Sequence, residues 1–240
     1  MANFDVQKKL NFFKKELHNS FDVTDRVLSK GETRVGFIYL KSLTDNLIFS
    51  SAIYEPLSVF EGELKFSEIK SLIQANDIKE IKLSEVCDNI VKGAVVIFTN
   101  ISDKILAVDI QKFNTRAPSE PPTSPVIQGP REGFTEDIKT NIGLLRKRFL
   151  SSDLVLKNLT VGRKTKTTVV IAYLHGVADK KVVQEVEKKL KAIDIDGVVD
   201  SYFLMPYLIS RPQSLFKQIG NTEKPDIVSA KLLEGRVAVL

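Results

Sequence analysis

The 240-residue sequence has one cysteine, two histidines and no tryptophan. Cys87 has no partner for an internal disulfide, so nothing in the sequence indicates an oxidising compartment. The longest apolar runs, 94–98 and 169–174, have the length of strands and fall far short of the ~20 residues that cross a bilayer. The first residues also lack the apolar core of a signal peptide. As given, the chain is expected to be soluble and not secreted by a signal of its own.

Sequence motifs typical of catalytic or metal-binding sites are also scarce. His18 and His175 are far apart, no Gly-x-Ser-x-Gly elbow occurs, and Cys87 lies in an apolar segment typical of a buried thiol. The acidic pair Asp194 and Asp196 lacks the later ligands of a calcium loop. We therefore predict a protein that is not an enzyme and has no cofactor, catalytic residue or metal ligand.

The composition is that of a folded protein, with 43% hydrophobic and 27% charged residues. There are 35 Lys and Arg against 30 Asp and Glu, a net charge of +5, which permits weak attraction to anionic surfaces without requiring it. The sequence lacks the aromatic platforms of single-strand binders, so no nucleic-acid partner is predicted.

Apolar periodicity and turn residues predict an α/β protein. An amphipathic helix is expected over 4–21, and Thr135 is expected to cap a later one. Pro56 is expected to end or kink the helix that Asp45 caps. Strands are predicted at 34–40, 94–99, 105–110, 154–161 and 167–174, and further helices at 67–74, 84–91, 136–149, 180–193 and 225–235.

Five of the nine prolines fall in residues 117–130, a composition typical of an extended linker. The predicted organisation is an N-terminal helix over 1–19, lobe one over 20–116, this linker, and lobe two over 131–240.

The two lobes resemble each other in sequence. Residues 33–45 align with 167–179, and Thr33, Val35, Tyr39, Leu40 and Asp45 have identical counterparts. A second alignment places residue 93 opposite 235, in the same order along the chain. We therefore predict two duplicated α/β lobes with mixed β-sheets flanked by helices, separated by a cleft.

The duplication raises a question about residue 240. In lobe one, the strand ending at Thr99 is followed by a partner strand at 105–110. Lobe two stops at Leu240, where the first strand of the equivalent pair is running. We expect the natural protein to continue past this residue.

Six segments resemble, in order, the motifs of the spore germinant-receptor A-subunit family. They cover all of lobe two: Gly129–Glu136, Asn141 with Leu145–Arg146, Val161–Lys166, Ala192–Gly197, Asn221–Asp226 and Leu233–Arg236. Lobe one matches more loosely, around Tyr39–Leu40 and Lys92–Gly93, and Ser42 stands where the family usually has glycine.

The resemblance implies a role that the residues alone do not. Members of this family have a large hydrophilic N-terminal region followed by membrane-spanning segments, and they lie in the spore inner membrane. They work with a transporter-like B subunit and a lipoprotein C subunit to sense nutrient germinants. This domain would lie on the cytoplasmic, spore-core side, with self-association in the full-length protein and membrane attachment through the C-terminal part.

Twelve charged positions in the motifs are expected to contact the other lobe or a partner. They are Arg131, Glu132, Glu136, Arg146, Arg163, Lys166, Asp194, Asp196, Glu223, Asp226, Glu234 and Arg236. Arg131 is expected to fix lobe orientation through a bidentate carboxylate pair, against the alternative of a surface lead-in to the next helix. The loop 162–166 is either an exposed hairpin tip or a contact for acidic partners or lipid headgroups.

Two functions stay open. The inter-lobe cleft, whose ligand-binding residues are unknown, could take part in germinant sensing and signal transduction. Alternatively, the domain is a purely structural assembly module that binds no small molecule.

Overall fold

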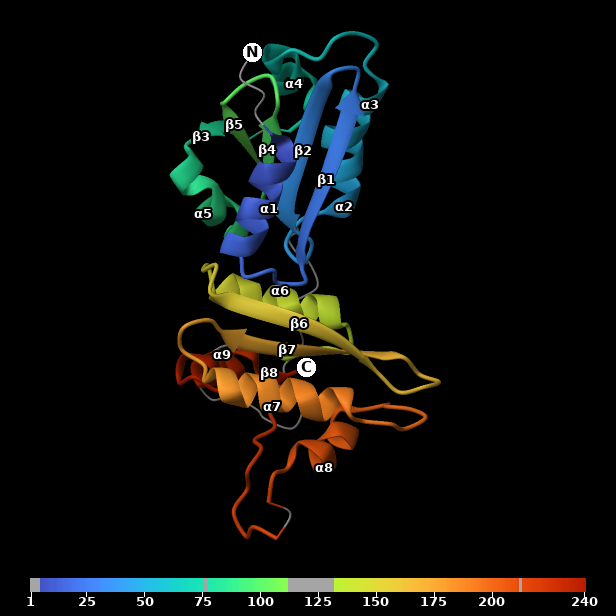
Figure 1. Cartoon of the computed structure of the whole chain (residues 1–240), viewed down its shortest axis with the longest axis vertical. Coiled ribbons are helices and arrows are strands. Elements are labelled where there is room, and N and C mark those ends of the chain that lie inside the picture. The colour runs from blue at the N-terminus through green and yellow to red at the C-terminus, as the bar shows by residue number, and fades with distance from the viewer. Residues whose placement is uncertain (1–4, 76, 112–131, 212) are drawn as a thin grey trace. The chain divides into compact units, whose positions relative to one another are not determined.

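The computed structural model describes residues 5–75, 77–111, 132–211 and 213–240 (Figure 1). The chain divides into two compact units. Unit 1 is Met1–Asn114 with Leu150–Ser152, and unit 2 is Thr115–Phe149 with Asp153–Leu240. Each unit has its own sheet and helices and is described by itself. The predicted linker over 117–130 lies outside the described residues.

Unit 1 is built on a five-stranded antiparallel sheet in the order β1-β2-β4-β5-β3. Side chains of β2 and β4 alternate between two apolar clusters, so both faces of these central strands are buried. The strands are β1 (Val23–Lys30), β2 (Thr33–Leu40), β3 (Ile78–Ile81), β4 (Ala94–Thr99) and β5 (Ile105–Asp109).

Helices cover both faces of this sheet. On one face, α1 (Val6–Glu16) and α5 (Val86–Val91), the latter entered by the 3₁₀ turn η2 (Leu83–Glu85), pack on β2 and β4. On the other face lie α4 (Phe66–Leu72) and a continuous helical segment of α2 (Asn46–Ile48), the π-helical turn η1 (Phe49–Tyr54) and α3 (Glu55–Val59).

The helix that was expected to end or kink at Pro56 continues to Val59. In an α-helix the proline lacks the N–H that would bond the carbonyl four residues earlier, and its ring clashes with that carbonyl. The wider π turn just before Pro56 provides space for the ring, and the Ala52 carbonyl accepts the Gln74 N–H at 2.9 Å instead. The Ala52 carbonyl therefore keeps a hydrogen bond, because the N–H of Gln74 takes the place of the N–H that Pro56 lacks.

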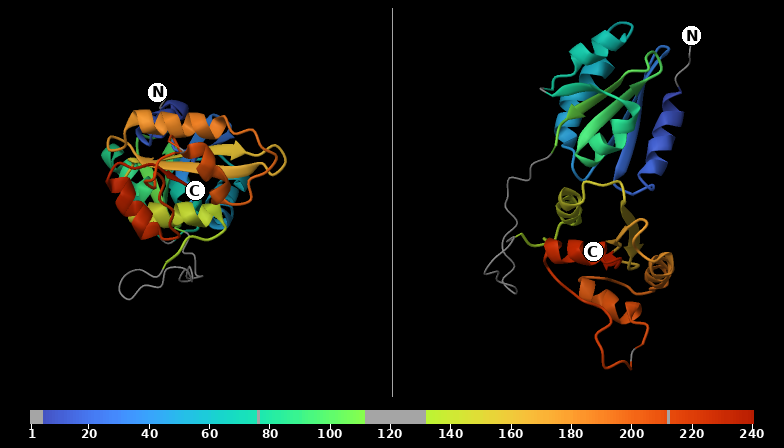
Figure 2. Two further views of the ribbon diagram at one scale, coloured as in Figure 1. Left: turned by 90° about the horizontal axis from the view of Figure 1, so that it is seen from below. Right: turned by 90° about the vertical axis from the view of Figure 1, so that its left-hand side faces the viewer.

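Unit 2 has a three-stranded antiparallel sheet of β6 (Leu154–Val161), β7 (Thr167–Leu174) and β8 (Ala238–Val239), in that order. One face packs on α6 (Ile138–Arg148) and α9 (Pro225–Leu233). The other packs on α7 (Lys180–Lys191), the 3₁₀-helix η3 (Ser201–Leu204) and α8 (Met205–Leu208). The left view of Figure 2 shows the strands between α7 and the α6–α9 pair.

Strand register confirms the internal duplication. The alignment of residue 33 with 167 and of 93 with 235 makes Phe37 equivalent to Ile171 and Ile97 equivalent to Val239. The structure pairs Phe37 with Ile97 in unit 1 and Ile171 with Val239 in unit 2. Two separately aligned segments thus meet at equivalent positions, which chance similarity between strands does not explain.

Helix ends repeat as well. Asp45 and Asp179 each cap the helix after the central strand by accepting a backbone N–H two residues on, both at 2.8 Å. Gly93 and Gly235 each follow a helix with a positive φ, +96° and +85°, and each donates its N–H to a carbonyl three residues back at 3.0 Å. In both units, therefore, an aspartate begins the helix after the central strand, and a glycine follows the helix before the next strand.

The predicted α/β class with helix-flanked sheets is confirmed, with three corrections. Every strand pair among the described residues is antiparallel, so the sheets are not mixed. The edge strands β1 and β3, rich in polar residues, were not predicted from the sequence. Asp137, not Thr135, caps α6, because its carboxylate accepts the N–H groups of Lys139 and Thr140.

Substitution of Gly235 by alanine tests the duplicated turn. A Cβ there would lie 3.0 Å from the Val177 carbonyl oxygen in a left-handed conformation, so Gly235→Ala is expected to lower the free energy of unfolding by about 1–2 kcal/mol or more. Gly93→Ala is expected to cost a similar amount. Chemical denaturation measures both, with Gly220→Ala as the control, since nothing lies within 4 Å of a Cβ there. Equal stability of all three variants would contradict the assignment.

Candidate functional site: an aromatic pocket in unit 2

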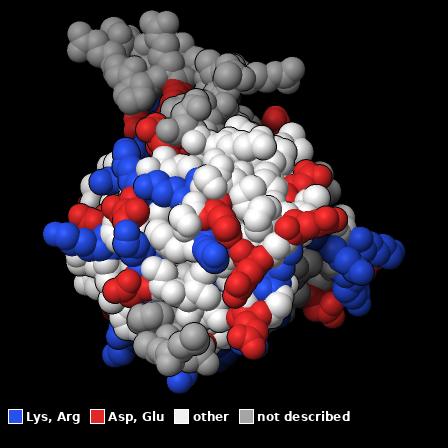
Figure 3. Space-filling view, turned by 90° about the horizontal axis from the view of Figure 1, so that it is seen from above, with Lys and Arg blue, Asp and Glu red and all other residues white. Residues whose placement is uncertain are grey.

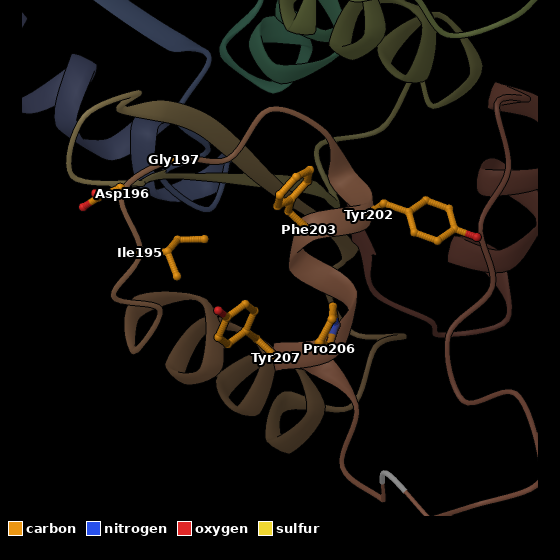
Figure 4. A pocket seen from close by; sticks show the side chains of 7 residues that line it. All are labelled: Ile195, Asp196, Gly197, Tyr202, Phe203, Pro206 and Tyr207. Atoms are coloured by element: carbon orange, nitrogen blue, oxygen red, sulfur yellow. The ribbon is translucent and has the colours of Figure 1, made fainter.

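A pocket of about 660 Å³ opens on the surface of unit 2. We call it the aromatic pocket. Its lining comes from the loop after α7 and from η3 and α8: Ile195, Asp196, Gly197, Tyr202, Phe203, Pro206 and Tyr207 (Figure 4). The volume lies within the range of small-molecule sites, roughly 300–1,000 Å³.

Local sequence explains how the aromatic side chains reach this surface. Asp200 caps η3, since its carboxylate accepts the Tyr202 N–H at 3.2 Å. Pro206 lies in the first turn of α8, where no N–H is needed and its fixed φ suits the helix. Val198 and Leu204 are buried against β7 and α7, so the residues between and after them are turned outward.

The rim at Asp196 is held by the hairpin that joins β6 to β7. Arg163 donates its backbone N–H to the Ile195 carbonyl at 2.9 Å, and Lys164 does the same to the Asp196 carbonyl at 2.8 Å. Thr165 Oγ1 accepts the Val198 N–H at 3.0 Å. These backbone contacts attach the pocket rim to the central hairpin of the unit.

Charged contacts add to this attachment. Asp196 lies 2.9 Å from an Arg163 guanidinium nitrogen and 3.1 Å from Lys164 Nζ, and Asp194 lies 3.5 Å from Arg163. All four side chains are exposed, so these ion pairs contribute little, about 0–1 kcal/mol each. The carboxylate of Asp196 points away from the rings in Figure 4, which leaves the pocket itself apolar.

Inside the pocket, the Phe203 ring, Ile195 and Pro206 provide apolar surface. The hydroxyl of Tyr207 lies toward Ile195, and the Tyr202 ring points outward (Figure 4). Such a site can hold an apolar or ring-bearing molecule and offer it a hydroxyl hydrogen bond.

The structure brings together three of the residues predicted from the motifs. Arg163, Asp194 and Asp196 form one ion-pair cluster beside the aromatic pocket. Lys166 lies on the same hairpin, exposed and with a left-handed φ of 47°. The tip of this hairpin therefore contacts the 194–198 loop of its own unit.

The residues around α6 are dispersed. Glu132 forms an ion pair with Arg148 at 2.7 Å, and Glu136 is exposed. Arg146 is almost completely buried, at 1% exposure. Arg131 and its predicted role at the lobe junction lie outside the described residues, so the bidentate pair stays a prediction.

Four further motif residues lie at the two ends of α9. The Glu223 carbonyl accepts the Phe134 N–H at 2.7 Å, and Asp226 lies in the first turn, where a carboxylate suits the helix dipole. Glu234 pairs with Lys231 at 2.8 Å and with Arg236 at 3.4 Å beyond the last turn. Contact of any of the twelve residues with a partner remains a prediction.

Sequence reasoning missed the aromatic residues of the pocket. The run 198–210 is apolar and follows the Asp196–Gly197 turn, and periodicity in it does not separate buried from exposed positions. The signal was the density of Tyr202, Phe203 and Tyr207 around a proline, since aromatic residues in an irregular segment often mark a binding surface.

The sequence matches the family described as "Bacillus/Clostridium GerA spore germination protein" over residues 11–240. The chain belongs to this family. It is 31% identical to "Spore germination protein B1" of Bacillus subtilis (strain 168) over 98% of this chain and 50% of that protein. It is 34% identical to "Spore germination protein A1" of the same organism, over 85% of this chain and 42% of that protein.

A solved structure extends the comparison. The crystal structure of the N-terminal domain of the A subunit of the Bacillus megaterium spore germinant receptor GerK3 matches with a TM-score of 0.74 and 25% identity, over 100% of this chain and 91% of that one. The predicted resemblance and fold are thereby confirmed. This GerA family chain spans about half the length of the curated relatives it matches. Among its described residues, no helix has the length and apolar character needed to cross a membrane.

The pocket rim provides one test. Thr165→Val removes the acceptor of the Val198 N–H and is expected to lower the free energy of unfolding by about 1 kcal/mol. Arg163→Gln removes only exposed ion pairs and is expected to cost less than about 1 kcal/mol, with the difference disappearing at high salt. Urea denaturation at low and high salt measures both. A larger, salt-sensitive loss from Arg163→Gln would show that charge holds the rim.

Cys87 provides a second test. Burial, followed by the nearby charges of Glu16 and Asp88, raises the pKa of its thiol to about 11. Only the thiolate is nucleophilic, and two pKa units mean about a hundredfold less of it at pH 8. Labelling by an aromatic disulfide reagent is expected to be at least ~10-fold slower in the folded chain than in urea. The thiol predicted to be buried is half-buried in the structure, and equal rates would contradict a protected thiol.

Proposed function

We propose that this chain is the N-terminal domain of a nutrient germinant receptor A subunit and takes part in sensing, signal transduction and receptor assembly during spore germination. Membership of the GerA family and the likeness to the GerK3 A-subunit domain support this assignment. The domain acts by binding, and it carries out no catalysis.

The aromatic pocket is the observation that carries the sensing part of the proposal. It is a shallow, open hollow that is lined mainly by apolar and aromatic side chains and offers the Tyr207 hydroxyl for orientation. A ligand there would touch both the 194–198 loop and η3, which contact different parts of the central hairpin. A ligand in the pocket would therefore alter the contacts that this loop and η3 make with β7.

The wider setting follows from the family resemblance. The full-length protein would lie in the spore inner membrane, with this domain on the cytoplasmic, spore-core side, and would work with B and C subunits and with further copies of itself. On the face in Figure 3, Lys and Arg side chains are interspersed with Asp and Glu, an arrangement better suited to protein contacts than to nucleic acid.

A purely structural role in assembly is the second candidate. It is favoured by the exposure of Tyr202 and Phe203, which keep more than half of their surface in contact with solvent. Aromatic residues on an open surface are typical anchors of protein–protein interfaces. In that case a neighbouring subunit, instead of a small molecule, would cover the pocket.

Thermal unfolding against a panel of amino acids, sugars, nucleosides and salts separates the two candidates. A ligand at about 100 times its Kd is expected to stabilise the domain by about 2.7 kcal/mol and raise the melting temperature accordingly. Phe203→Ala is expected to abolish that rise. Phe12→Ala in α1 is the matched control, because both phenylalanine side chains are 53% exposed.

Each result has a definite meaning. A saturable rise that Phe203→Ala removes and Phe12→Ala keeps supports sensing at the aromatic pocket. The absence of any rise at millimolar concentrations, together with stability that depends on protein concentration, would support assembly alone. A rise that survives Phe203→Ala would move the ligand to another site.

A further inference from the structure

A loop of unit 2 presents two apolar side chains to solvent. It follows α8 and projects from the unit (Figure 1; right view of Figure 2). Leu215 is 99% exposed and Phe216 is 85% exposed, so neither packs on its own chain. We call residues 213–217 the tip. Scattered apolar residues are normal on a surface, but two adjacent and almost wholly exposed ones on a projecting loop call for a partner.

Hydrogen bonds hold the base of this loop closed. Gln218 Oε1 accepts the N–H groups of Ser210 and Arg211 at 3.2 and 3.1 Å, and Gln218 Nε2 donates to the Arg211 carbonyl at 2.5 Å. At the tip, Ser214 Oγ accepts the Phe216 N–H at 3.2 Å. The loop is thus shaped before it meets any partner, which lowers the entropy cost of binding.

Helix α7 also holds the base of this loop. Lys189 Nζ donates to the Leu208 carbonyl at 2.9 Å and to Ser210 Oγ at 2.6 Å, and it pairs with Glu185 at 2.9 Å. The base of the loop is therefore attached to α7, which packs on the sheet of unit 2.

The charged residues of the loop itself all have one sign, and the nearest acid, Glu185 of α7, is paired with Lys189 at the base. Arg211 precedes the tip and Lys217 is its last residue, and residues 205–222 contain no aspartate or glutamate. Lys217 reaches Asn221 at 3.0 Å, a neutral partner that leaves its charge uncompensated. By contrast, the basic residues Arg163 and Lys164 of the β6–β7 hairpin are already paired with acids.

We propose that the tip inserts into the surface of an anionic lipid bilayer. Leu215 and Phe216 would enter the boundary between headgroups and acyl chains, while Arg211 and Lys217 would lie among the anionic headgroups. Long basic side chains suit this position, because their stems contact apolar surface while their charges stay in water. The aromatic residues Tyr202 and Tyr207 on neighbouring η3 and α8 are also of the type that settles at membrane interfaces.

A bilayer fits these observations better than a protein partner. A convex pair of side chains needs a matching hollow on a protein, whereas a bilayer adapts to any such shape. The proposal rests on the proposed function for the presence of a membrane nearby. Vesicle binding is nevertheless measured independently of nutrient binding at the aromatic pocket, so either idea can fail alone.

The absence of tryptophan from the chain allows a direct test. Phe216→Trp places a single fluorophore at the tip. With vesicles of phosphatidylcholine containing about one third phosphatidylglycerol, its emission is expected to shift to shorter wavelength and to be quenched by brominated acyl chains. Leu47→Trp in unit 1, where Leu47 is 82% exposed, is the control and is expected to show neither change.

Co-sedimentation with the same vesicles measures the partition coefficient of the chain between water and the bilayer. The double variant Leu215→Ser/Phe216→Ser is expected to reduce the partition coefficient at least ~10-fold, and Arg211→Gln/Lys217→Gln by a similar factor. The matched control Leu47→Ser/Val199→Ser removes two other apolar side chains, 82% and 83% exposed, and is expected to bind like the unchanged chain. Vesicles of phosphatidylcholine alone are expected to bind weakly.

Three outcomes would overturn the proposal. They are an emission spectrum of the Phe216→Trp variant that anionic vesicles leave unshifted, binding that the tip variants leave intact, and equal loss in the matched control. If vesicles do not bind while sedimentation velocity reveals self-association that Leu215→Ser/Phe216→Ser abolishes, the partner of the tip is a second copy of the chain.

Discussion

Pairing of β7 with β6 at all eight of its positions determines which side chains of unit 2 face α6 and α9 and which face α7 and α8. A slip of one residue would exchange the two sets, because successive side chains of a strand point to opposite faces. The same pairing places the turn at 162–166 beside the 194–198 loop, where backbone hydrogen bonds hold the rim of the aromatic pocket. The position of the pocket rim thus depends on the register in which β6 pairs with β7.

The two units share this plan and differ in one stretch of chain. Unit 1 uses the residues between α3 and α5 to build α4, which covers its sheet, and β3, which widens it. Unit 2 uses the equivalent stretch between α7 and α9 for η3, α8 and the projecting loop. Both surfaces to which we assign binding arise from this one divergent insertion, whereas the duplicated frame around it supplies rigidity. Function added to a repeated scaffold in this way leaves the core of the other copy untouched.

Most helices and strands of the two units could be predicted from the sequence, whereas the two proposed binding surfaces could not. Strands 154–161 and 167–174 were predicted with their observed ends because β-branched runs lie between a turn and a capping aspartate. β1 was missed because an edge strand with a largely solvated surface has a polar sequence. Thr135 was mistaken for the cap because it also accepts the N–H two residues on, that of Asp137 at 3.3 Å, whereas the helix begins only after Asp137. Arg163, Asp194 and Asp196 were chosen from motifs, and their contact with one another follows only from tertiary packing. The exposure of Phe203 and Phe216 depends on what lies next to them in space, which periodicity within a short irregular segment does not encode.

The π turn in unit 1 has a consequence for helical phase. Phe49, Ile53 and Leu57 recur every four residues and are all buried, although in a regular α-helix of 3.6 residues per turn such a row drifts around the axis. The wider turn takes up this drift and keeps the three side chains in line along the sheet. A π turn amounts to one residue inserted into an α-helix. Loss of that residue would restore the α-helical pitch and with it the clash between the Pro56 ring and the carbonyl four residues earlier, so the π turn and Pro56 depend on each other.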